Sequence, residues 1–98
     1  MSQYIIPIDP LPNQSFDVDL NKKRHHFDFI TKGIFLYMNL SIEDEEKLNG
    51  VICLNNVNLV QYDDRGFIGK LYFLDTQGDL DPIYTELGTR WQLIYEDA

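Results

Sequence analysis

The chain has 98 residues, of which 44% are hydrophobic and 24% charged, and sixteen acidic against eight basic side chains give a formal net charge of −8. This length allows a single domain, residues 1–98, with one modest core, and the hydrophobic fraction is too high for a disordered chain. The acidic balance disfavours binding to nucleic acid or to an anionic membrane surface, because both interactions depend on clustered lysine and arginine.

The only cysteine is Cys53, which excludes an intramolecular disulfide and a cysteine-based zinc site and fits a reducing compartment. We expect no signal peptide, because the N-terminus lacks a basic segment followed by an apolar one. The apolar runs are also shorter than the roughly 18 residues of a membrane helix. We therefore expect a soluble protein that is not exported by the general pathway.

The first strands are predicted from alternating hydrophobicity. Residues 3–8 form a β-type run that Pro7 interrupts, as in an edge strand or at a strand end, and residues 9–13 form a proline-rich turn. In the next strand Phe16, Val18 and Leu20 share one face. A polar turn at residues 21–23 then leads into a strand that completes a hairpin, with His25, Phe27 and Phe29 on one face.

The middle of the chain combines a central strand with an acidic connection. A turn at residues 31–33 precedes a strand at residues 34–40, which is apolar on both faces and begins with Ile34 on the side of Leu36. Residues 41–50, which include Glu43 to Glu46 and end in Asn49-Gly50, are predicted as a long solvated loop with at most one helical turn. A short strand at residues 51–54 and an asparagine-rich bend at residues 55–58 follow.

The C-terminal part alternates turns with two strands. We expect a turn at residues 63–66, a strand at 67–74, a polar turn at 75–82, an irregular turn at 83–87 ended by Gly88, and a last strand at 89–95. Turn signals recur every 8–12 residues, and no amphipathic helix of normal length is present. The prediction is an all-β fold, a small antiparallel β-barrel or sandwich of about 6–8 strands with at most one short helical turn.

Residue chemistry points to no reaction. His25 and His26 are adjacent on a strand, so their rings face opposite ways and cannot easily chelate one ion. The carboxylates of Asp63 and Asp64 are expected to face water, and Cys53 is expected to be a buried, inert thiol. We therefore predict no catalytic residue, no metal site and no cofactor.

One window imitates a calcium-binding loop. Its first, third, fifth, seventh and twelfth positions are Asp75, Gln77, Asp79, Asp81 and Glu86. The imitation fails because Leu80 occupies the sixth position, where the loop needs glycine.

Short blocks at both ends of the chain carry a family resemblance. They lie within YIIPIDPLPNQSFDVDL (residues 4–20) and GKLYFLDTQGDLDPIYTELGTRWQLIY (residues 69–95), and are Ile6-Pro7-Ile8, Pro12-Asn13-Gln14, Asp81-Pro82, Leu87-Gly88-Thr89-Arg90 and Leu93-Ile94-Tyr95. On these blocks the chain resembles the baseplate plug proteins of contractile-tailed phages, and the LGTR-x-x-LIY ending is the most specific piece. The long acidic connection at residues 41–50 departs from the shorter turn expected in that family.

The resemblance implies a non-enzymatic structural protein of the virion, located at the central hub of the tail baseplate and made and assembled in the host bacterial cytoplasm. It implies contacts with hub, spike or tail-tube proteins and with further copies of the chain in a symmetric assembly, while the acidic balance argues against contacts with nucleic acid or membrane. The candidate architectural and interface residues are Pro12, Asn13, Gln14, Asp81, Pro82, Gly88, Arg90, Trp91 and Tyr95.

Two of these residues have a specific expected role. Gly88 would allow a backbone bend that a side chain would obstruct, and Arg90 would present a planar donor fork on the face opposite Trp91, unless it is an ordinary exposed strand residue. Most of the aromatic residues should form the core, and any surplus would mark an interface.

Two other functions stay open from the residues alone. A small ligand- or carbohydrate-binding β module would show a deep, aromatic-lined pocket, and a hydrolase would place two carboxylates across a cleft.

Overall fold

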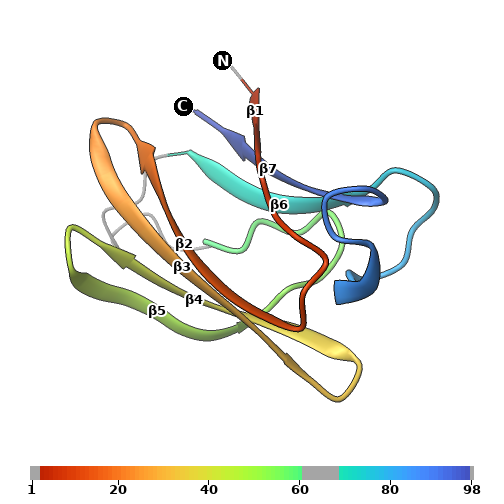
Figure 1. Ribbon diagram of the computed structural model, residues 1–98. Helices are drawn as coiled ribbons and strands as arrows, with labels where there is room; N and C mark the ends of the chain where they lie inside the picture. The colour runs from red at the N-terminus through yellow and green to blue at the C-terminus, as the bar shows by residue number, and fades with distance from the viewer. Residues whose placement is uncertain (1–2, 61–68, 98) are drawn as a thin grey trace.

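The structure is a computed structural model that describes residues 3–60 and 69–97. Within these residues seven strands form two antiparallel sheets, and the one helical element is the 3-10 turn η2 (Tyr84–Glu86). The three-stranded sheet has the order β1 (Gln3–Ile6), β7 (Trp91–Glu96), β6 (Lys70–Asp75), and the four-stranded sheet has the order β2 (Asn13–Leu20), β3 (Lys23–Lys32), β4 (Phe35–Ile42), β5 (Glu45–Ile52). The predicted all-β fold is confirmed, and the sheets are not closed into a barrel (Figure 1).

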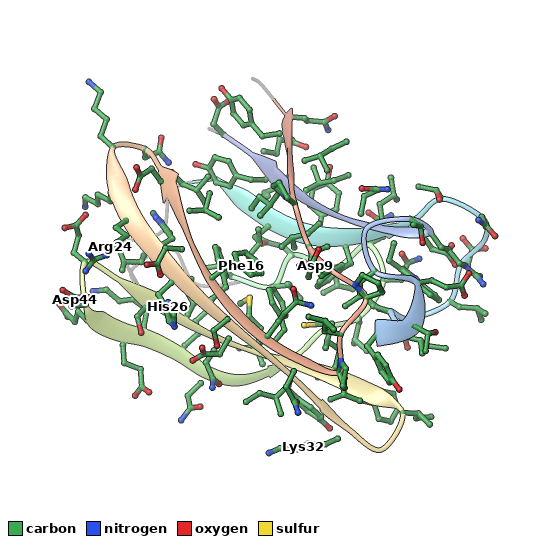
Figure 2. All side chains as sticks on the ribbon, in the orientation of Figure 1. Asp9, Phe16, Arg24, His26, Lys32 and Asp44 are labelled. Atoms are coloured by element: carbon green, nitrogen blue, oxygen red, sulfur yellow. The ribbon has the colours of Figure 1, made fainter. Side chains whose placement is uncertain are left out.

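One hydrophobic core draws on both sheets. Phe27 and Phe29 of β3 are fully buried, and the Phe29 ring meets Phe73 of β6 edge-on at 5.7 Å between centroids. Phe16 of β2 adds a third ring, 5.7 Å from Phe27 and 5.8 Å from Phe29 (Figure 2). Each fully buried side chain of this size contributes roughly 1.5–3 kcal/mol, so these rings supply much of the stability of a domain this small.

The first hairpin forms as its alternation predicts. Leu20 pairs with Lys23, and the two residues between them, Asn21 and Lys22, both have positive φ, as a type I′ turn requires. The inward face carries the buried His25, while the outward face of β2 and β3 is polar except at Ile30.

The second hairpin corrects the predicted start of the central strand. Residues 33–34 form its turn, so β4 begins at Phe35, and Ile34 lies in the turn with 76% of its surface exposed instead of facing the core. Gly33 has a φ of 64°, which suits the first central position of a two-residue turn, and Thr31 and Lys32 therefore stay in β3. The prediction of a central strand holds, because β4 pairs with both β3 and β5.

The long acidic connection predicted at residues 41–50 was wrong. The chain turns through only two residues, Glu43 and Asp44, both with positive φ, and β5 begins at Glu45. Arg24 holds this turn, since its backbone N–H donates to Glu43 Oε1 at 2.7 Å and its guanidinium pairs with Asp44 at the tip (Figure 2). The turn is as short as in the other two hairpins of this sheet, so the expected departure from the plug-protein pattern disappears.

Asn49-Gly50 forms a bulge and not the predicted turn. The pairing of β4 with β5 shifts between Met38 and Leu40, so Asn39 faces two residues of β5. The Gly50 N–H donates to Asn39 Oδ1 at 2.7 Å, and Gly50 has a φ of 72°. The strand predicted at residues 51–54 is therefore the end of β5, with residues 53 and 54 beyond it.

The asparagine-rich bend covers one sheet edge. Asn56 N–H donates to the carbonyl of Phe73 at 2.7 Å, and the side-chain oxygens of Asn58 and Asn55 accept from the N–H groups of Leu71 and Asp75. The outer edge of β6 is therefore hydrogen-bonded by side chains and backbone of residues 55–59.

The predicted irregular turn before Gly88 is η2. Among residues 3–60 and 69–97, no helix is long and apolar enough to cross a membrane. The two ends of the described chain lie close together, because β1 pairs with β7 (Figure 1).

Candidate functional site

Asp75, predicted in a polar turn, ends β6 with a fully buried carboxylate. Arg90 donates from Nε and Nη2 to its two oxygens at 2.8 and 2.9 Å. The backbone N–H groups of Gln77 and Leu80 donate to the same carboxylate at 2.9 and 3.0 Å. Four donors thus satisfy one buried charge, which is the condition for burying it without a large loss of stability.

These contacts explain the electrostatics of the pair. Hydrogen bonds from Arg90, more than any other contact, hold the pKa of Asp75 well below its ordinary range, and Asp75 in turn raises the pKa of Arg90. The carboxylate is therefore ionised at every physiological pH, and its oxygens are occupied by donors from within the chain. The predicted failure of the calcium-loop imitation agrees with this geometry.

The side chains of Arg90 and Trp91 are brought together, and Arg90 lies in the turn before β7 instead of in the strand predicted from residue 89. The Arg90 guanidinium lies 4.5 Å from the centroid of the Trp91 ring, in the geometry of a cation–π contact. Trp91 is completely buried, and its Nε1 donates to the carbonyl of Leu80 at 3.0 Å. The donor fork expected on the face opposite Trp91 instead lies over the Trp91 ring and binds Asp75. We call Asp75, Arg90, Trp91 and Leu80 the Asp75 cluster.

Asp81 and Pro82 continue the same loop. Asp81 Oδ1 accepts from the N–H of Asn55 at 3.0 Å, and Pro82 is buried. The hydrogen bond of Asp81 thus joins this loop to the segment that covers β6.

Gly88 lies where two backbone segments touch. Its φ is 84°, and a Cβ at this position would lie 2.3 Å from the carbonyl oxygen of Ile8. The predicted bend that excludes a side chain is present, and the obstructing group is the chain that follows β1.

Pro12, Asn13 and Gln14 hold the N-terminal turn. The carbonyl of Pro12 and Oδ1 of Asn13 both accept from the N–H of Thr31, at 2.9 and 3.3 Å. The Gln14 amide spans the turn, accepting from the Asp9 N–H at 3.1 Å and donating to the Asp9 carbonyl at 2.6 Å. The proline-rich turn is therefore an ordered part of the domain.

Tyr95 joins the two sheets. Its hydroxyl accepts from the side-chain amide of Asn21 in the first hairpin turn, and its ring stacks on Tyr4 of β1 at 6.2 Å. Tyr95 is 2% exposed, whereas Tyr4 is 51% exposed.

A groove of about 350 Å³ opens beside this contact. One wall is formed by Tyr4, Ile5, Ile6 and Pro7, and the other by residues 18–21 at the end of β2, with Tyr95 and Asp97 between them. Side chains of a strand alternate between its faces, so four consecutive residues in one wall mean that the backbone edge of the strand forms it. The groove therefore lies between the edges of two strands, and its two aromatic rings stack on each other instead of lining a deep pocket.

The two histidines lie on opposite faces of β3, as predicted. His25 is 2% exposed, stacks on Phe27 and has a pKa lowered mainly by burial. His26 faces outward between Asp17 and Asp28, with Nε2 3.0 Å from Asp28, and the hydrogen bond to Asp17 does most to raise its pKa (Figure 2).

The remaining candidates form no reactive site in the described part of the chain. Burial raises the pKa of the Cys53 thiol, so the residue is the expected inert thiol. No group of three His, Cys, Asp or Glu side chains suited to a metal ion occurs within residues 3–60 and 69–97. Asp63 and Asp64 lie outside the described residues.

Sequence reasoning missed the walls of the groove. Tyr4 and Ile5 were predicted only as part of the β-type run at residues 3–8, and Asp19 only as part of the strand that became β2. The available signal was the combination of an apolar edge strand, at Tyr4 and Ile5, with a second strand whose outward residues are acidic.

Comparison with known proteins gives one family. The family model described as "Cyanophage baseplate Pam3 plug gp18" matches residues 3–98. No curated protein matches the sequence.

Proposed function

Because the chain belongs to the family of the cyanophage baseplate Pam3 plug gp18, we propose that it is a structural protein of the phage tail that packs at the central hub of the baseplate. Family membership makes it a baseplate protein of the virion tail. The hub position and the individual contacts are the proposal.

The observation that carries the proposal is the extent of the match, which covers the chain from residue 3 to its end. The geometry supports it in a second way. The residues in the blocks of resemblance hold the fold together: Gly88 packs on Ile8, Gln14 clamps Asp9, and Arg90 binds Asp75. Sequence blocks whose residues stabilise the fold fit a structural protein that contributes its shape to an assembly and catalyses no reaction.

The proposed partners are hub, spike or tail-tube proteins, and further copies of the chain arranged around the symmetry axis of the tail. The net charge of −8 favours partners with basic contact surfaces and disfavours nucleic acid or membrane. Synthesis and assembly would take place in the cytoplasm of the host bacterium.

The test is co-expression of the tagged chain with the hub, spike and tail-tube proteins of the same phage, together with mass spectrometry of purified virions. We expect at least one tail protein to co-purify, and the chain to be detected in virions. The major capsid protein of the phage is the negative control. Failure to recover any tail protein, with no chain in the virion, would refute the proposal.

A further inference from the structure

The groove between β1 and β2 is bounded by two strand edges with open backbone groups. β1 pairs only with β7, and β2 pairs only with β3, so within residues 3–60 and 69–97 neither outer edge has a partner strand. An open edge presents a row of N–H and C=O groups that an added strand can bind.

Hairpin geometry identifies the open groups of β2. Leu20 and Lys23 flank a two-residue turn and therefore exchange hydrogen bonds, and bonding alternates along the ladder from there. Asp19, Asp17 and Ser15 fall on the non-bonded positions, so their N–H and C=O groups point away from β3. At the end of β2 this is the direction of the groove, whose wall includes Asp19.

The other two sheet edges are protected. Residues 55–59 cover the edge of β6, as described above. The edge of β5 carries the charged side chains of Glu45, Glu46 and Lys47 and is distorted by the bulge at Gly50, both of which are common devices against strand addition. By contrast, β2 pairs with β3 in unbroken register over its full length. The groove therefore holds the two edges best suited to accept another strand.

Charge and exposure define what the groove would accept. Ile5 is 64% and Tyr4 51% exposed, so each face of β1 offers apolar contact to an added strand. The described lining residues include Asp19 and Asp97 and contain no lysine, arginine or histidine. A second copy of this chain would bring its own acidic edge, with Asp17 and Asp19, against these carboxylates, so like charges oppose self-pairing here.

We propose that the β1–β2 groove binds an extended segment of a neighbouring tail protein by strand addition, and that this segment carries lysine or arginine opposite Asp19. The proposal rests on the proposed function, because it takes the partner to be a tail protein. Main-chain hydrogen bonds to β1 or β2 would supply affinity, and the groove carboxylates would select a basic segment.

The experiment uses the full chain and the tail protein recovered by co-expression. Asp19→Lys reverses charge in the groove, and Asp19→Pro removes one outward N–H without breaking a bond to β3. Glu46→Lys makes the same change of charge on the β5 edge and is the matched control. Should Asp19→Pro fail to fold, Ile5→Lys is the second variant, since the exposed Ile5 side chain can be replaced without opening the core.

We expect Asp19→Lys and Asp19→Pro to weaken binding at least about tenfold and Glu46→Lys to leave it unchanged. We also expect hydrogen exchange at the amides of Ser15, Asp17 and Asp19 to slow in the complex. If the wild-type chain binds its tail partner but the groove variants bind equally well and no β2 amide is protected, this inference is overturned and the proposed function stands. If the wild-type chain binds no tail protein, both proposals fall.

A third result identifies a different occupant. Protection of the β2 amides in the chain alone, lost on dilution, would mean that a second copy fills the groove, and it would overturn the heterologous segment proposed above.

Discussion

Arg90, immediately before β7, donates two hydrogen bonds to the carboxylate of Asp75, and its guanidinium lies over the ring of Trp91. The pair closes the 15-residue excursion between β6 and β7, because the same carboxylate also accepts from Gln77 and Leu80. Trp91 also holds this loop, because its Nε1 donates a hydrogen bond to the carbonyl of Leu80. Contacts within the chain therefore explain the LGTR-x-x-LIY block, which is the most specific part of the family resemblance.

Replacing Arg90 should destabilise the fold strongly. Arg90→Ala leaves a buried carboxylate without its counter-ion, and the thermal midpoint should fall on the order of 10 °C, as expected for breaking a buried pair in a small domain. Arg90→Lys should recover only part of this loss, since an ammonium group cannot form two parallel bonds and stacks poorly on Trp91. Thermal unfolding followed by circular dichroism measures both variants.

The matched control is the exposed pair of Arg24 with Asp44, whose side chains are 48% and 84% exposed. Exposed pairs contribute little, so Arg24→Ala should shift the midpoint by no more than about 2 °C. Equal effects of Arg90→Ala and Arg24→Ala would contradict the assignment of a buried pair to Asp75.

The same pair predicts acid sensitivity. The pKa of Asp75 is lower in the folded than in the unfolded protein, so the unfolded state binds more protons as the pH falls. The stability due to this group is present above the ordinary aspartate pKa of about 4 and is lost as the pH falls toward the folded value. The free energies of unfolding of the wild type and Asp75→Asn, measured with urea between pH 2.5 and 6, should differ most at pH 6. The difference should narrow below pH 4. A difference that stays constant across this range would argue against the linkage.

Alternation predicted the strands wherever one face meets the core and the other meets water. Phe16 and Phe27 are examples, because each lies on the apolar face of a strand whose opposite face is mainly polar. Local sequence could not decide what Gly33 and Gly50 do, since a glycine with positive φ serves a turn and a bulge equally well. The buried state of Asp75 was also beyond local reasoning, because its partner Arg90 is 15 residues away and only tertiary packing joins them.

The adjacent histidines should titrate in opposite directions. Burial lowers the pKa of His25, whereas hydrogen bonds to Asp17 and Asp28 raise that of His26, so the two values should lie on either side of about 6.5. The stability contributed by His26 is present below about pH 6.5 and is lost as the pH rises through its folded pKa. The effect of His25 is the reverse, because the unfolded state binds its proton more readily and stability falls below about pH 6.5.

Nuclear magnetic resonance of the imidazole Cε1–Hε1 signals as a function of pH measures both values. His26→Gln assigns the signals and should leave the low pKa of His25 in place. Two histidines that titrate together near 6.5 would contradict the burial of one and the pairing of the other.

Gly88 offers the sharpest separation of conformational strain from steric contact. Gly50 and Gly88 both have positive φ, at 72° and 84°, but a Cβ at Gly50 would meet nothing within 4 Å, whereas a Cβ at Gly88 would lie 2.3 Å from the carbonyl oxygen of Ile8. Gly50→Ala should therefore cost about 1–2 kcal/mol for the left-handed backbone alone. Gly88→Ala carries the same strain and must also displace the segment that follows β1, so we expect a loss on the order of 3–4 kcal/mol. Chemical denaturation of both variants measures the difference. Similar losses in the free energy of unfolding would mean that the segment with Ile8 moves away from the added Cβ at little energetic cost. The glycine in the LGTR block would then be required for its backbone angle alone.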